Sequence, residues 1–223
     1  MTFVPAPGSH LAKRLSVIEA AAKVFCCEGY AGANIDLIAA EASVSRQTVY
    51  NHYRDKETLF KAVVAEITER CNAGFFETLA TFPDHPQDLP ADLIAFAIRL
   101  NSNCVCSKDG KFLRRLIQKE SERYPELFQA WRDDGPSKTW AALAARFARL
   151  ALAGHLDMDD PDLAARQFLA LNNADLQLTF MLGGTPSEEQ IHRSAENAVR
   201  TFLKAYGRKA ETGPREKTPL AAE

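Results

Sequence analysis

The chain has 223 residues, of which 46% are hydrophobic and 25% are charged. This composition is typical of soluble globular domains and excludes a disordered or fibrous polypeptide. Its 27 lysines and arginines face 29 aspartates and glutamates, so the formal net charge is -2. The molecule as a whole therefore does not attract polyanions or anionic membranes, and a polyanion would have to be bound by a local patch.

Membrane and metal signals are missing from the sequence. No stretch approaches the roughly 18 to 20 uninterrupted apolar residues that a spanning helix needs, and the N-terminal MTFVPAPGSH has no basic region followed by an apolar one. The five cysteines lack the paired C-x2-C spacing of a zinc site. We therefore expect a cytoplasmic protein with reduced cysteines and with no membrane contact, metal or cofactor.

Apolar residues recur at helical spacing along most of the chain, and no segment alternates as a strand would. Breakers such as TFPDHPQDLP divide this pattern. Asp160-Pro161 and Thr185-Pro186 each place a capping side chain before a proline at an expected helix start, and Thr185 to Glu188 has capping-box spacing. The sequence predicts an all-α protein of about nine helices.

The same pattern predicts four segments. Residues 1–10 form an N-terminal arm, residues 11–60 a short helical domain, and residues 61–206 a longer helical domain. From Gly207 to residue 223, charge is mixed with glycine and proline and no apolar period is present. We expect these last residues, 207–223, to be a disordered tail.

Residues 34–53, NIDLIAAEASVSRQTVYNHY, have the pattern of two short helices joined by a brief turn. Asn34 is placed to cap the first helix and Ser45 the second. The apolar residues of the first helix share one face, at Ile35, Ile38, Ala39 and Ala42. The segment therefore predicts a helix-turn-helix.

The second of these helices would present hydrogen-bonding side chains, namely Arg46, Gln47, Thr48, Tyr50, Asn51 and His52. Arginine, glutamine and asparagine can each bond two atoms of a base edge, whereas tyrosine and histidine suit phosphate oxygens. Nearby Arg54 and Lys56 add positive charge, which only Asp55 opposes. The segment is thus expected to bind DNA, although Tyr50 and His52 are equally compatible with packing between helices.

A longer run of residues, from Ile18 through Gly29-Tyr30 and Ala42-Ser43-Val44-Ser45 to Leu59-Phe60, resembles the N-terminal domain of the TetR family of transcriptional regulators. The stretch from Phe112 through ESERYPELFQAW to DDPDLAARQFLAL is similar to the C-terminal regulatory domain of its AefR-like subgroup. Two positions depart from the usual pattern: Ser43 replaces a glycine, and Asn34 replaces a threonine.

The resemblance implies a homodimer that binds a palindromic double-stranded DNA operator through the third helix of each subunit. The last two helices, about 162–181 and 187–206, would form the dimer. Transferred to this sequence, the base-reading residues are Arg46, Gln47, Thr48 and Asn51. The phosphate contacts are Asn34, Ser45, Tyr50, His52 and Lys56. The expected function is that of a repressor released by a small apolar or amphipathic ligand.

The longer domain has more aromatic residues than a small bundle needs, and the resemblance implies that some of them line a ligand cavity. Our candidates are Phe96, Phe128, Trp131, Phe168 and Asn172. Each aromatic residue is also compatible with plain core packing. For Asn172, a place in a dimer interface is the alternative that its sequence context favours.

Catalysis is not expected, because the chain has no Gly-rich phosphate loop, nucleophile elbow or H-E-x-x-H motif, and its histidines are scattered. One alternative mode of regulation is open. In this alternative, the same DNA-binding dimer is regulated by thiol oxidation or by a protein partner instead of a small ligand. Cys104 and Cys106 are the cysteines for which a redox role is considered.

Overall fold

The computed structural model describes residues 10–208, and these residues form eleven α-helices and one π-helical turn without a named β-strand. The expected all-α fold is confirmed. Residues 1–9 of the predicted arm and residues 209–223 of the predicted tail lie outside the described part of the chain.

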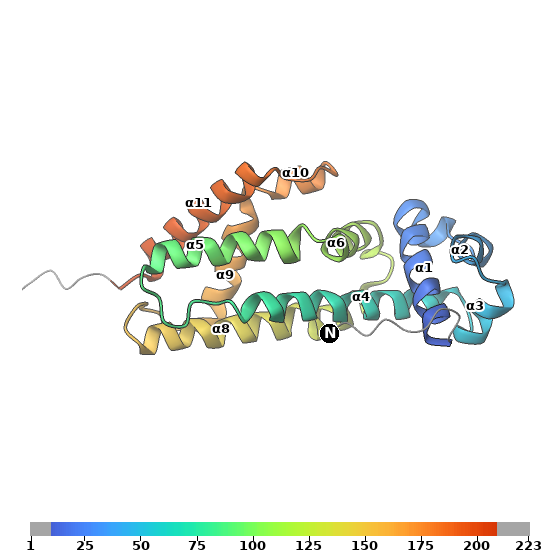
Figure 1. Cartoon of the computed structure of the whole chain (residues 1–223), viewed down its shortest axis with the longest axis horizontal. Helices are drawn as coiled ribbons and strands as arrows, with labels where there is room; N and C mark the ends of the chain where they lie inside the picture. The colour runs from blue at the N-terminus through green and yellow to red at the C-terminus, as the bar shows by residue number, and fades with distance from the viewer. Residues whose placement is uncertain (1–9, 209–223) are drawn as a thin grey trace, which may run out of the picture.

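The first three helices form one end of the molecule, which we call the head (Figure 1). They are α1 (His10–Gly32), α2 (Ile35–Glu41) and α3 (Arg46–His52). Helix α4 (Lys56–Leu79) starts in the head and runs into the rest of the molecule (Figure 1). The expected boundary at residue 60 therefore falls inside a continuous helix.

The remaining helices form the larger part of the molecule, beyond the head (Figure 1). In chain order they are α5 (Leu89–Leu100), the π-helical turn (Asn101–Val105), α6 (Lys108–Glu120), α7 (Pro125–Asp134), α8 (Pro136–Leu152), α9 (Pro161–Ala174), α10 (Gln177–Met181) and α11 (Glu188–Tyr206). Among these helices, α6 lies next to the head (Figure 1). It packs against both α1 and α4.

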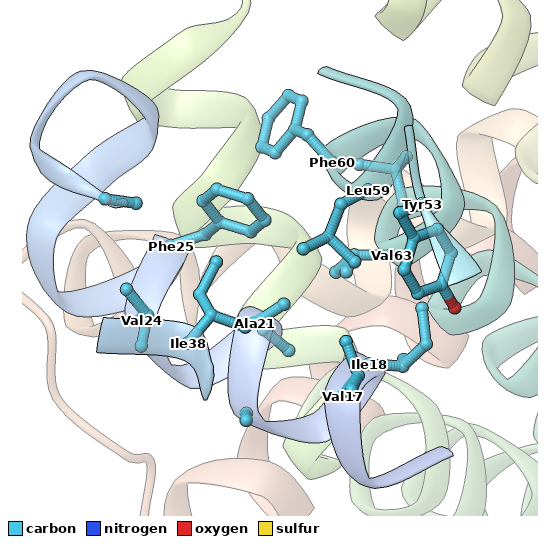
Figure 2. Close-up of a cluster of buried hydrophobic side chains, with 14 of the residues drawn as sticks. Val17, Ile18, Ala21, Val24, Phe25, Ile38, Tyr53, Leu59, Phe60 and Val63 are labelled. Carbon is cyan, nitrogen blue, oxygen red and sulfur yellow. The ribbon is translucent and has the colours of Figure 1, made fainter. Parts of the chain in front are cut away.

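The head is held together by an apolar cluster that spans several helices (Figure 2). On α1, Ile18, Ala21 and Phe25 recur at intervals of three and four residues, which places them on one face. Ile38 of α2 and Phe60 of α4 pack against that face. The same cluster continues into α6 and α7 through Phe112, Leu113, Leu116 and Phe128. The head therefore shares its core with the longer helical region.

A second core fills the opposite end, between α5, α8, α9 and α11. Four of its six buried phenylalanines pack ring against ring in a row. The ring centroids of Phe96 and Phe168 are 6.4 Å apart, those of Phe168 and Phe147 are 5.2 Å apart, and those of Phe147 and Phe202 are 4.9 Å apart. Such offset and edge-on ring pairs stabilise a core beyond the area they bury.

Two helix starts test the capping predictions. Asp160 caps α9 and Pro161 is its first residue, as expected. The expected start at Thr185 is wrong, because α11 begins at Glu188 with Ser187 as its cap. Ser187 and Gln190 form a complete reciprocal capping box, which satisfies two backbone N–H groups at once.

The expected helix over 162–181 is divided into α9 and α10. At the break, the Asn173 amide donates to the carbonyl of Leu169 at 2.9 Å, and the N–H of Leu176 turns back to the carbonyl of Asn173 at 3.0 Å. Local bonds of this kind compete with the regular helical ladder. The division is one reason why residues 10–208 contain more α-helices than the nine or so expected from periodicity.

Candidate nucleic-acid interface and internal cavity

The turn between α2 and α3 is a tight helix terminus. The N–H of Ser43 bonds the carbonyl of Ala40 at 3.1 Å, and the N–H of Val44 bonds the carbonyl of Ala39 at 3.0 Å. This Schellman pattern needs a left-handed residue at its centre, normally glycine. Ser43 takes that conformation with a φ of 54°, as the only non-glycine with positive φ in residues 10–208. The unusual serine is therefore accommodated by a strained backbone.

Ser45 caps the start of helix α3, and its hydroxyl accepts the N–H of Thr48 at 3.1 Å. Asn34 caps α2 in the same way, accepting the N–H of Leu37 at 2.9 Å. Both predicted caps are confirmed. Val49 is fully buried and anchors α3 to the head. The other side of α3 is left to solvent.

The exposed side of α3 carries most of the predicted base-reading residues. Arg46, Gln47, Tyr50 and Asn51 are exposed, and Thr48 is half-buried. Arg46 forms an ion pair with Asp36 of α2, and Gln47 Nε2 donates to Asn51 Oδ1 at 2.9 Å. Exposed pairs of this kind contribute little to stability. These side chains can therefore exchange their present partners for another polar surface at small cost.

A surface hollow of about 350 Å³ brings together four predicted DNA contacts, Asn34, Arg46, Tyr50 and Lys56. Within this hollow, Lys56 also forms hydrogen bonds inside the protein that the sequence did not indicate. Its ammonium donates to the carbonyls of Tyr30 at 2.9 Å and of Ala33 at 2.8 Å. Lys56 thereby fixes the connection between α1 and α2, and its phosphate contact stays a prediction.

His52 is half-buried at the end of α3, with its ring centroid 4.2 Å from that of His10. Burial lowers the pKa of His52 below its ordinary value of 6.5, and the nearby His10, Arg14 and Lys13 lower it further. A neutral imidazole at pH 7 can still donate one hydrogen bond to a phosphate oxygen. Both the packing and the phosphate interpretation of His52 are thus compatible with its position.

A pocket of about 420 Å³, which we call the cavity, lies between α4, α6, α7, α8 and α9, and the end of α5 and the π-helical turn also line it. Of the five predicted ligand contacts, Trp131 and Asn172 are among its lining residues. Phe96 and Phe168 are instead buried in the second core, and Phe128 belongs to the core of the head. These three aromatics pack other helices together and are not among the cavity residues.

Asn172 lines the cavity, but its side-chain amide already forms hydrogen bonds within the protein. Its side-chain amide donates to the carbonyl of Ala97 at 3.1 Å, and it exchanges hydrogen bonds with the Asn101 amide at 3.1 and 3.2 Å. Buried amides of this kind are normally satisfied within the protein. Asn172 therefore connects α9 to α5 and the π-helical turn.

Several cavity residues were not among the sequence candidates. They include Phe75, Leu100, Leu113, Arg114, Ile117, Trp140 and Leu169. They come from five helices and lie far apart in the sequence. Periodicity marks such residues only as one face of each helix.

The cysteines near the cavity, Cys71, Cys104 and Cys106, are half-buried. Burial raises the pKa of Cys71 to about 12 and also raises that of Cys104 and of Cys106. A thiol reacts through its thiolate, so these environments disfavour nucleophilic or redox chemistry. All five cysteines are free, and residues 10–208 contain no cluster of ligating side chains that would hold a metal ion. None of the described helices is long and apolar enough to cross a membrane.

Helix α6 connects the cavity to the head. Its residues Leu113 and Ile117 line the cavity, while its last residue, Glu120, is buried against the end of α1. Glu120 Oε1 accepts the N–H of Tyr30 at 2.8 Å, and Lys119 Nζ donates to the carbonyl of Cys26 at 3.0 Å. A displacement of α6 would therefore act directly on the helix that carries the helix-turn-helix.

The chain matches two protein-family models. Residues 17–63 match the model described as bacterial regulatory proteins, tetR family, and residues 92–208 match the C-terminal domain of the AefR-like transcriptional repressor. Together the two models account for the head and for most of the remaining helices.

Relatives and solved structures agree with this match. The HTH-type transcriptional repressor Rv1474c of Mycobacterium tuberculosis is 35% identical over 206 residues, which cover 86% of this chain and 95% of that protein. The HTH-type transcriptional activator FasR of Mycolicibacterium smegmatis is 33% identical over 99 residues, and the chain spans 45% of its length. A crystal structure of a TetR-family transcriptional regulator from Mesorhizobium loti is 30% identical, with a TM-score of 0.78 over 89% of this chain and 98% of that one.

Proposed function

Because the chain belongs to the TetR family of bacterial transcriptional regulators, which bind DNA and are not enzymes, we propose that it is a repressor of the following kind. It binds a palindromic operator as a homodimer and leaves the operator when a small apolar or amphipathic ligand binds. Residues 11–60 bind DNA, and residues 61–206 sense the ligand and form the dimer.

The observation that carries the proposal is the exposed polar face of α3. Its cap and its buried Val49 hold the helix on the head, while Arg46, Gln47 and Asn51 face solvent. These side chain types recognise guanine and adenine edges in the major groove. In a dimer, two such helices would enter successive major grooves at a separation of roughly 34 to 36 Å or somewhat more.

The proposed dimer uses α9, α10 and α11, within the expected ranges 162–181 and 187–206. On α10 and just after it, Leu178, Met181 and Leu182 are 66%, 63% and 79% exposed. Clustered exposed apolar side chains favour burial against a partner. A second copy of the chain is the partner that a two-fold operator requires.

For release, we propose that ligand in the cavity shifts α4 and α6 together. Both helices line the cavity, and both contact the head. A ligand can favour a conformation that no longer fits the operator only as far as it binds that conformation more tightly. The alternative of control by thiol oxidation is disfavoured by the raised pKa values of Cys71, Cys104 and Cys106.

The proposal is tested by selecting genomic fragments with purified protein and footprinting the enriched site at a stated salt concentration. We expect a protected palindrome and one dimer bound per site. Selection with the Asn51→Ala variant, whose base contact is removed, should enrich the site less strongly. A folded dimer that enriches no sequence above non-specific binding, even after refolding to remove a co-purified ligand, would contradict the proposal.

A further inference from the structure

The cavity contains one cation that no carboxylate neutralises. Among the lining residues that the structure describes, Arg114 of α6 is the only charged side chain. Within residues 10–208, its guanidinium contacts a backbone carbonyl and an aromatic ring. Its Nη2 donates to the carbonyl of Val105 at 3.1 Å, and its central carbon lies 3.7 Å from the centroid of the Phe180 ring.

Among residues 10–208, three of the four other half-buried arginines pair with carboxylates, and the fourth, Arg99, donates to the hydroxyl and the carbonyl of Thr81. Arg14 pairs with Glu66, Arg70 with Glu19 and Asp109, and Arg146 with Asp84. For Arg114, burial lowers the pKa, and the Cys106 thiol, rather than a carboxylate, is the group that opposes this shift. Burying a cation without a counter-charge is unfavourable. The position of Arg114 therefore resembles half of an ion pair.

The guanidinium retains capacity for another partner. It carries five N–H donors, and the bond to Val105 uses one of them. The ring of Phe180 covers one face of the group, which leaves the edges of the planar fork for further bonds. Two parallel N–H donors on one edge match the two oxygens of a carboxylate.

The remainder of the cavity is suited to a hydrocarbon. Its walls include Phe75, Leu100, Leu113, Ile117, Trp131, Trp140 and Leu169. No aspartate or glutamate lies among the lining residues, so the cavity offers no anionic partner to a cationic ligand. A volume of about 420 Å³ is within the range of small-molecule sites.

We propose that the ligand is an apolar monocarboxylate, whose carboxylate pairs with Arg114 and whose aliphatic or aromatic body fills the cavity. This inference rests on the proposed function, in which the same cavity binds the effector. One negative charge balances the single cation, whereas a dianion such as a phosphate monoester would leave excess charge among apolar walls. Arg114 lies on the helix that ends at Glu120, so the ion pair would form on the element that holds the head.

Binding is measured by tryptophan fluorescence in the absence of DNA. The chain has two tryptophans, and both of them, Trp131 and Trp140, line the cavity. The probes are two matched sets: decanoate, decanol and decyltrimethylammonium, and 4-phenylbutyrate with 4-phenylbutanol. In at least one set we expect the acid to bind ten-fold or more tightly than the alcohol, and decyltrimethylammonium to bind more weakly than decanol.

Matched variants identify the cation responsible. Arg114→Gln should weaken binding of the acid by about ten- to a hundred-fold and change binding of the alcohol less than two-fold. Arg115→Gln removes the same charge from the next residue, which is exposed and outside the cavity, and should leave both affinities unchanged. Arg114→Lys keeps the charge without the fork and should give an intermediate affinity. It also serves as the test variant if Arg114→Gln does not fold.

The proposal is overturned if neither acid binds at millimolar concentration, if acid and alcohol bind equally, or if Arg114→Gln and Arg115→Gln have equal effects. Failure of the proposed function is a separate result. An acid that binds through Arg114 without changing operator affinity would contradict ligand release and support the ion pair. Release of the operator by acid and alcohol alike would support ligand release and contradict the ion pair.

Discussion

The two candidate sites of the molecule differ in how their polar groups are held. On α3, polar side chains are exposed and paired with other exposed side chains, as in Gln47 with Asn51 and Arg46 with Asp36. In the cavity, Asn172 is fully engaged inside the protein, and Arg114 is left without a counter-charge. The first arrangement favours a large polar partner that replaces weak surface contacts. The second favours a small partner that supplies the missing charge of a half-buried ion pair.

The comparison also shows that the two sites are not separate bodies. The cluster that packs the head includes Phe112 and Leu116 of α6 and Phe128 of α7. Phe60 of α4 touches Phe25 and Tyr30 in the head, with centroids 4.9 and 4.8 Å away, and Tyr124 just before α7 at 5.8 Å. A change at this junction should reach both sites.

The largest effect is therefore expected from Phe60→Ala. Loss of this buried ring should lower the free energy of unfolding by about 3 to 5 kcal/mol. Because the core is shared, circular dichroism and tryptophan fluorescence should follow one common urea transition. Phe76→Ala removes a ring from the same helix where it is 44% exposed, and should cost about 1 kcal/mol or less. Equal losses of stability in the two variants, or separate transitions for the two signals, would contradict a core shared by the head and the longer helical region.

Glu120→Ala should weaken the connection between the sites. The N–H of Tyr30 would lose its acceptor, at a cost of about 1 to 3 kcal/mol in the free energy of unfolding. Probe binding in the cavity should persist, while its effect on operator affinity should diminish. Glu122→Ala, at an exposed position two residues away, is the control. If ligand response survives Glu120→Ala unchanged, the hydrogen bond to Tyr30 does not transmit it.

A smaller effect of opposite sign is expected from Ser43→Gly. Glycine relieves the left-handed strain but has more freedom to lose on folding, so the net gain should be about 0.5 to 1 kcal/mol. The matched control is Ser43→Ala, which keeps a Cβ and should give no such gain. Chemical denaturation of both variants measures the difference. A glycine variant less stable than the wild type would mean that the serine side chain stabilises the turn.

The smallest effect concerns pH. The pKa of His52 is lower in the folded protein than its ordinary 6.5, mainly through burial. As pH falls below about 6.5, the unfolded chain therefore takes up this proton first. The contribution of neutral His52 is present above that pH and is lost as pH falls toward the folded pKa. Between pH 7.5 and 5.5, the wild type should lose more stability in urea denaturation than His52→Gln. Parallel losses would place His52 at its ordinary pKa.

A feature could be predicted from the sequence when the residues that form it lie close together along the chain. Asn34 and Ser45 cap their helices through bonds to residues three positions away, and a short window of sequence contains that information. The pairing of Asn172 with Asn101 joins residues 71 positions apart. No local pattern marks it, and so Asn172 was interpreted as a ligand or interface residue.

Chemically identical residues can also differ only in their surroundings. Arg114 and Arg115 are neighbours in one basic helix, yet one faces the cavity and the other is exposed. Lys56 was expected to contact phosphate from its place in the family pattern. Its bonds to the carbonyls of Tyr30 and Ala33 become visible only once α1 and α4 are packed together.

The most direct test of the account is the base selectivity of α3. Affinities of the wild type, Arg46→Ala and Asn51→Ala would be measured on the footprinted operator and on its single-base substitutions, at one salt concentration. Each variant should lose about 1 to 3 kcal/mol of binding free energy and relax the preference at one operator position per half-site. Unchanged selectivity in both variants would contradict the assignment of this face as the one that reads DNA.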